Sequence, residues 1–172
     1  MTHATPGRED LLAALAPVLE RVAALAPQTR TTDDAISELE AELSTSFPIG
    51  GAVAQSIRGA IEAAIAEGWL CDRGAPEARF SRLAKPTPRT HDLSVDVVSL
   101  EGAAVRHTHP AGEITLGFPA PGTDDTVRFD GRPVGWVFCR PGSTHTPTVE
   151  GGRMNLIYFL PGGAVQWSTE SA

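Results

Sequence analysis

The sequence predicts a mainly β fold, in which an antiparallel sandwich or barrel of short strands follows an α-helical amino-terminal region. Three observations lead to this prediction. Glycine is concentrated in the second part of the chain, with six of the seventeen glycines in residues 1–92 and eleven in residues 93–172. Apolar residues repeat at helical spacing in the first part and form short strand-like runs in the second. Glycine and proline pairs separate these runs, as turns separate short strands.

Three segments account for the expected helices. Residues 10–25 carry apolar side chains at spacings of three and four, and Pro17 inside them predicts a kink or two shorter helices. A second helix starts at the Thr32–Asp33 pair, whose side chains suit an amino-terminal cap, and continues through Leu43. A third covers residues 53–67 and ends at a glycine, which suits the left-handed position after a helix.

The composition shifts near residues 87–90, after a short turn-rich hairpin. We therefore expect a helical cap region with a small hairpin over residues 1–90 and a β domain over residues 91–172. Eight strands are expected in the β domain, at residues 93–100, 103–109, 113–118, 126–129, 134–139, 144–149, 153–160 and 164–167.

Composition and charge exclude several classes of protein. The chain has 172 residues, of which 41% are hydrophobic, and a formal net charge of −7. This acidic balance disfavours nucleic-acid binding, and no stretch reaches the roughly 18 apolar residues that cross a membrane. The amino terminus lacks the basic and apolar regions of a secretory signal, so we expect a cytoplasmic protein with no nucleic-acid or membrane partner. Cys71 and Cys139 lie far apart, outside any CxxC motif, and are expected to be reduced.

Histidine gives the sharpest functional signal, because three of the five histidines lie in the motifs RHTHPAGE and RPGSTH. In an extended strand His107 and His109 point to the same face, about 7 Å apart along the backbone. A proline and a glycine then bend the chain and can return Glu113 to the same point, while a second turn precedes His145. Three imidazoles and a carboxylate suit a divalent first-row metal. His3, near the terminus, is expected to be exposed to solvent.

The two motifs resemble the paired motifs of the cupin superfamily, whose members are antiparallel jelly-roll barrels that hold a metal through two histidines, a glutamate and a third histidine. This resemblance covers about residues 93–168. The matching residues are Gly102, His107, His109 and Glu113 in the first motif and Gly135, Pro141, Gly142 and His145 in the second. It implies a cupin-type barrel with one divalent transition metal on His107, His109, Glu113 and His145. The identity of the metal stays open among iron, manganese, nickel, cobalt and zinc.

A narrower resemblance covers most of the chain. The segments GWLCDRG, RFSRLAKP, RHTHPAGEI, FDGRPVGW, PGSTHTPTVEGG and LIYFLPGGA occur in this order and together are similar to the bacterial p-hydroxylaminobenzoate lyases. The activity that this implies converts 4-hydroxylaminobenzoate and water into 3,4-dihydroxybenzoate and ammonia, a step in nitroaromatic catabolism. Its atoms balance without oxygen or nicotinamide, and the sequence shows no Rossmann fingerprint, P-loop or flavin motif.

A small aromatic acid as substrate requires an apolar slot for its ring and a cation for its carboxylate. Phe118 and Trp136 lie on expected barrel strands and are predicted to bind the ring. Arg82, Arg140 and Arg153 are candidates to bind the carboxylate, and Arg82 is preferred because its segment can close one mouth of the barrel. Tyr158, the sole tyrosine, and Glu113 are predicted to transfer protons.

Two other functions remain open on the same residues. A cupin dioxygenase for a small aromatic acid would use iron and oxygen at these ligands, and product formed without oxygen would exclude it. A non-enzymatic cupin would bind an effector in the barrel, with the helical region contacting DNA, and the acidic charge disfavours this reading. Resemblance to cupins also implies a homodimer.

Overall fold

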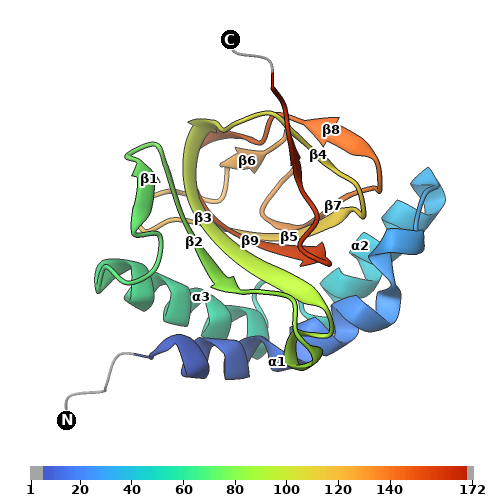
Figure 1. Cartoon of the computed structure of the whole chain (residues 1–172). Helices are drawn as coiled ribbons and strands as arrows, with labels where there is room; N and C mark the ends of the chain where they lie inside the picture. Colours follow the sequence, from blue (N-terminus) through green and yellow to red (C-terminus); the bar gives the residue numbers. More distant parts are fainter. Residues whose placement is uncertain (1–5, 170–172) are drawn as a thin grey trace.

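The computed structural model describes residues 6–169, so His3 lies outside the described part of the chain. Helices lie against one face of a seven-stranded sheet, the large sheet, and a three-stranded sheet, the small sheet, closes the barrel on its other side (Figure 1). All paired strands are antiparallel. The predicted fold class, a cupin-type antiparallel barrel with a helical amino-terminal region, is therefore confirmed.

The first helix, α1 (Arg8–Leu25), runs unbroken past Pro17, so of the two expected outcomes, a kink or two shorter helices, the second is wrong. Pro17 is exposed, so the hydrogen bond that it cannot donate is missing on the solvent side of the helix. The opposite side buries Leu15, Val18 and Leu19. Packing of this apolar stripe against the sheet keeps the helix undivided through the proline.

The other helices begin and end close to their predicted positions. They are α2 (Asp33–Ser46) and α3 (Ala52–Ala66). Thr32 caps α2, since its hydroxyl accepts a hydrogen bond from the Ala35 N–H at 3.2 Å. Gly68 follows α3 with φ +80°, a left-handed conformation that favours glycine. Two short 3₁₀ helices cover Pro27–Thr29 and Pro88–Thr90.

The strands form two sheets of different size. The large sheet has the order β1 (Arg73–Ala75), β2 (Ala78–Ala84), β3 (Leu93–Ala103), β9 (Thr148–Pro161), β5 (Glu113–Pro119) and β7 (Gly135–Cys139), with β6 (Arg128–Phe129) paired to β9. The small sheet has the order β10 (Gln166–Trp167), β4 (His107–His109) and β8 (Ser143–His145). The β1–β2 hairpin, which falls within residues 1–90, pairs with β3 and so extends the large sheet.

Strand β9 joins the end of one expected run, at residues 144–149, to the whole of the next, at residues 153–160, while β8 takes the start of the first run. The glycines between these runs, Gly151 and Gly152, have φ values of +85° and +148° and lie inside the strand. The pairing with β3 shifts register at this point. The two glycines therefore form an irregularity of the bulge type within one long strand, where a turn between two strands was expected.

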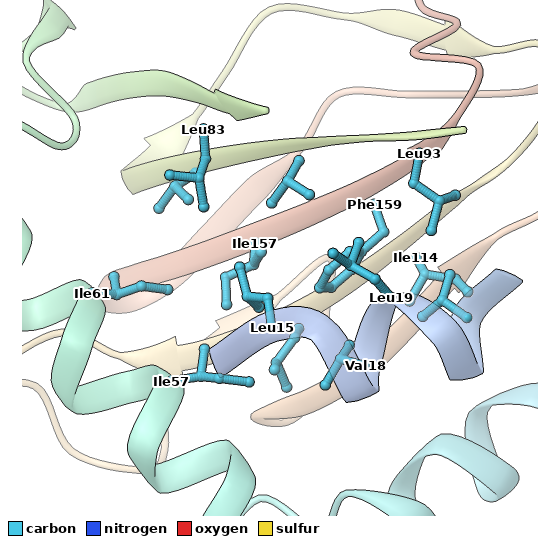
Figure 2. Close-up of a cluster of buried hydrophobic side chains, with 14 of the residues drawn as sticks. Leu15, Val18, Leu19, Ile57, Ile61, Leu83, Leu93, Ile114, Ile157 and Phe159 are labelled. Atoms are coloured by element: carbon cyan, nitrogen blue, oxygen red, sulfur yellow. The ribbon is translucent and has the colours of Figure 1, made fainter. Parts of the chain in front are cut away.

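The helices and the large sheet share one hydrophobic core. Figure 2 shows side chains of α1 and α3 that point toward side chains of the sheet; those labelled are Leu15, Val18, Leu19, Ile57, Ile61, Leu83, Leu93, Ile114, Ile157 and Phe159. Burying one such side chain fully contributes about 1.5–3 kcal/mol. Because side chains alternate along a strand, the face of the large sheet turned away from the helices carries a different set, which includes Tyr158 and Leu156.

No helix among residues 6–169 is long and apolar enough to cross a membrane. Both cysteines are free thiols. Burial raises the pKa of Cys71 to about 12, so this thiol behaves as a small apolar group in the core.

Candidate metal centre

Three imidazoles meet at one point on the barrel side of the small sheet. His107 stands opposite His145 in the β4–β8 ladder, and His109 follows two residues later, so all three side chains project from the same face. The Nε2 atom of His109 lies 3.0 Å from that of His107 and 2.9 Å from that of His145. The structure thus brings together the three histidines that the two motifs supply.

For two of the three histidines, a hydrogen bond on the far side of the ring fixes which nitrogen faces the centre. His107 Nδ1 donates to the carbonyl oxygen of Val105 at 2.8 Å, and His145 Nδ1 donates to the carboxylate of Asp130 at 2.7 Å. Because carbonyl and carboxylate oxygens accept, both histidines carry their proton on Nδ1 and present the Nε2 lone pair.

The third ring makes the arrangement fit a cation. His109 is fully buried, and its Nδ1 atom has no hydrogen-bond partner among residues 6–169. A proton on its Nε2 could serve only one of the two lone pairs that face it from His107 and His145. A divalent cation satisfies all three nitrogens at once, so the donor set fits a transition metal.

Glu113 reaches the same point from the first position of β5. The turn before it needs Gly112, whose φ is +83° and whose N–H donates to the carbonyl oxygen of His109 at 3.2 Å. Glu113 Oε2 lies 3.5 Å from His109 Nε2, while its Oε1 accepts a hydrogen bond from the Thr115 hydroxyl at 3.0 Å. The bend expected after the two histidines therefore returns the carboxylate to them.

Burial dominates the electrostatics of the centre. It lowers the pKa of His109 to about 3, with the neighbouring His107 and His145 adding to the effect. It raises the pKa of Glu113 to about 8, and the carboxylates of Asp96 and Asp130 add to that shift. Neutral imidazoles are the form that binds a metal, and a bound cation offsets the cost of a buried carboxylate.

Two residues of the centre were not predicted. Cys139 Sγ and ligand atoms of His109, Glu113 and His145 all lie within 4.8 Å of one another. Cys139 reaches the centre because it stands directly opposite Glu113 in the β5–β7 ladder. Correct pairing of these two strands would have been needed to predict it. Asp130, the hydrogen-bond partner of His145, lies in the segment FDGRPVGW, which was noted only as a family signature.

Phe118 and Trp136, the predicted ring-binding residues, lie on the helix-facing side of the large sheet. Both belong to the core that the sheet shares with the helices. Trp136 Nε1 donates a hydrogen bond to the carbonyl oxygen of Phe47 at 2.9 Å, just beyond the end of α2. The structure does not bring these two aromatic side chains together with the histidines.

Tyr158 and Arg82 lie on the other face, toward the barrel. The register across the large sheet aligns Arg82, Asp96, Tyr158 and Thr115 in one row. Arg82 donates two hydrogen bonds to the carboxylate of Asp96, at 2.8 and 3.1 Å. Tyr158 is buried, burial raises its pKa well above 10, and its hydroxyl forms no hydrogen bond with any described residue.

Comparison with known proteins gives the family. The model of the family described as PnbB: 4-hydroxylaminobenzoate lyase matches residues 20–167. The chain belongs to the 4-hydroxylaminobenzoate lyase family. The match includes α2, α3, both sheets and all four residues predicted to hold a metal, so it agrees with the resemblance found in the sequence.

Relatives of the family are similar over most of their length. The chain is 25% identical to a 4-hydroxylaminobenzoate lyase of Nocardioides sp. (strain LMS-CY) over 166 residues, which cover 92% of this chain and 94% of that protein. It is 27% identical to a 4-hydroxylaminobenzoate lyase of Pseudomonas putida over 125 residues, which cover 62% and 69%.

Solved structures overlap with parts of the chain. An RmlC-like cupin protein of Ralstonia eutropha JMP134 has 14% sequence identity and a TM-score of 0.42, and the match covers 56% of this chain and 62% of that one. The polyketide cyclase RemF of Streptomyces resistomycificus has 20% identity and a TM-score of 0.39, with 57% and 75% covered.

Proposed function

We propose that this chain is a metal-dependent lyase that converts 4-hydroxylaminobenzoate and water into 3,4-dihydroxybenzoate and ammonia. One observation in this member of the lyase family carries the proposal. The Nε2 atom of His109 lies 3.0 Å from that of His107 and 2.9 Å from that of His145, and the buried carboxylate of Glu113 lies beside them. A divalent cation held by His107, His109, Glu113 and His145 supplies Lewis-acid assistance to cleavage of the N–O bond. That bond is the internal oxidant, so the balance requires neither oxygen nor nicotinamide.

Tyr158 is the proposed proton donor. Its raised pKa keeps the phenol protonated at neutral pH, so Tyr158 Oη donates a proton to the departing oxygen and does not act as a base in the free enzyme. Carboxylates of Glu113 and Asp130 contribute to this shift, which supports a position for the phenol beside the ligands. The Tyr158 hydroxyl, which forms no hydrogen bond with a described residue, is also available to bind substrate.

Glu113 is the second proposed proton carrier. Its two oxygens differ, because Oε2 faces His109 while Oε1 is held by the hydroxyl of Thr115. That second bond fixes the carboxylate plane on the barrel side of the sheet. We propose that this oxygen, Oε1, exchanges a proton with the substrate, while Oε2 faces His109.

Arg82 is proposed to bind the carboxylate of the substrate. It stands on the same face as Tyr158, two strands away, at an edge of the barrel where its side chain is 43% exposed. Its present partner, Asp96, holds the guanidinium through two hydrogen bonds, while the Arg82 side chain keeps a solvent-exposed side. The carboxylate of an entering substrate can therefore compete for the guanidinium.

The proposed reaction is tested by product analysis under argon. Purified protein is loaded with one divalent metal at a time and given 4-hydroxylaminobenzoate. We expect 3,4-dihydroxybenzoate and ammonia in equal amounts. Products that appear only when oxygen is admitted, or a ring-cleaved product, would replace the lyase with a dioxygenase.

A further inference from the structure

Exposed apolar side chains gather beside one metal ligand. Large hydrophobic residues that are exposed in the described part of the chain are Trp167 (64%), Val105 (63%) and Phe80 (46%). The first two flank His107: Val105 accepts its Nδ1–H, and Trp167 stands opposite it in the β10–β4 ladder. Single exposed apolar residues need no explanation, but a pair around a ligand of the candidate centre does.

The ladder determines where the indole lies. Directly opposite residues of an antiparallel pair project from the same face, so the Trp167 side chain lies on the face from which His107 reaches the centre. The two ring centroids are 5.1 Å apart, at 61°. A hydrogen bond from the Ser168 N–H to the Arg106 carbonyl oxygen, at 3.2 Å, also holds this segment against β4.

Within the described part of the chain, the rest of the indole surface has no partner that explains its position. Among residues 6–169, Trp167 Nε1 donates no hydrogen bond and His107 is the one ring stacked or tilted against the indole. Trp136 shows the contrast, since it is 6% exposed, donates to Phe47 and packs against Phe159. Trp167 therefore presents an aromatic face to solvent at the edge of the metal centre.

We propose that Trp167 is a specificity-determining residue that binds the ring of a planar benzoate while the nitrogen substituent of that ring enters the centre at His107. The proposal rests on the proposed function, because it takes the ligand class from that reaction. An aromatic face next to the ligands favours a flat ring over an aliphatic acid of equal charge.

The test measures binding separately from turnover. The probe is 4-aminobenzoate, which keeps the ring, the carboxylate and a para nitrogen but lacks the N–O bond. Its affinity for the metal-loaded protein is measured by calorimetry for the wild type, Trp167→Ala and Trp167→Phe. Trp69→Phe is the matched control, because Trp69 is a partly buried tryptophan on the helix side of the sheet. Metal content is measured in every sample.

We expect Trp167→Ala to weaken binding about tenfold at unchanged metal content, since a lost aromatic pair has an effect of this order. Trp167→Phe should retain most of the affinity, and Trp69→Phe all of it. Equal affinity of Trp167→Ala and the wild type, within twofold, would overturn the proposal. So would a wild type that does not bind 4-aminobenzoate.

Two further outcomes separate this proposal from the proposed reaction. If the wild type fails to turn over 4-hydroxylaminobenzoate but Trp167→Ala still loses affinity for 4-aminobenzoate, the reaction is wrong and the binding role of Trp167 stands. If Trp167→Ala keeps the affinity of the wild type but lowers the molar mass in solution, the indole belongs to a contact between two copies of the chain and the binding role is wrong.

Discussion

Asp130 Oδ2 lies 2.7 Å from His145 Nδ1. The other oxygen of Asp130 accepts a hydrogen bond from the Thr148 N–H at 2.8 Å, so the carboxylate is held at both ends. Together these contacts keep the His145 proton on Nδ1 and turn Nε2 toward His109. Asp130 is therefore a positioning residue for the candidate metal centre.

Asp130→Asn should weaken metal binding about tenfold, and Asp130→Ala by up to about 100-fold, because such partners orient the ligand and raise its basicity. Asparagine tolerates the left-handed backbone of this position (φ +48°), but it has one acceptor oxygen, so the change removes the charge and one of the two hydrogen bonds. Affinity is measured by competition with a chelator. Asp124→Asn, at an exposed carboxylate, is the control; wild-type affinity in Asp130→Ala would contradict the positioning role.

Metal retention and activity should fall together below pH ~6. Protons compete with the metal for imidazole nitrogens, whose ordinary pKa is about 6.5. Burial lowers the pKa of His107 and lowers that of His109 to about 3, so these ligands stay neutral further into acid than free imidazole. The midpoint for metal release therefore lies below 6.5 and moves lower when free metal is raised. A midpoint that does not respond to metal concentration would refute competition at the histidines.

Arg82→Ala should raise KM for 4-hydroxylaminobenzoate about tenfold, since hydrogen bonds to charged groups contribute about 1.5–3 kcal/mol. It should leave KM for N-phenylhydroxylamine, which has no carboxylate, unchanged. Asp96→Asn is the complementary variant: it releases the Arg82 guanidinium from its carboxylate partner and should lower KM for the acid. Equal effects of Arg82→Ala on both substrates would show that Arg82 does not bind the carboxylate.

Phe118→Leu should lower the free energy of unfolding by about 1 kcal/mol, as expected for a core substitution of similar volume. Phe118 is 1% exposed and packs on the helix side of the sheet, so KM should stay within twofold of the wild type. Urea unfolding and steady-state kinetics measure the two effects. A raised KM with unchanged stability would instead support the ring-binding role that the sequence indicated for Phe118.

The sequence predicted that the candidate ligands converge because most of this convergence depends on short-range geometry. Alternation in one strand places His107 and His109 on one face, and a tight turn returns Glu113 within six residues of His107. The helix boundaries were also predictable, because a capping residue such as Thr32 and a terminal glycine such as Gly68 act within a few residues of the helix end. The uncertain points were local conflicts, such as Pro17 inside α1, where packing outweighed the missing hydrogen bond.

Residues whose positions depend on strand pairing were harder to predict. Phe118 and Trp136 lie on strands of the barrel, but which face of a strand is turned to the helices is decided by the register of the whole sheet. Cys139 and Asp130 reach the centre through pairings with β5 and β9 and their flanking turns, which single-strand patterns do not reveal. The strand β10, which carries Trp167, is two residues long and was expected only as a short run.

The most direct test of the account is a metal titration of metal-free protein under argon, with bound metal and ammonia release measured at each addition. The account predicts no turnover without metal, then a linear rise that saturates at about one ion per chain. His109→Ala should bind little metal, show no turnover and keep the circular-dichroism spectrum of the wild type. Full turnover by the metal-free protein, or full metal occupancy in a His107→Ala/His109→Ala double variant, would contradict a metal-dependent lyase at this centre.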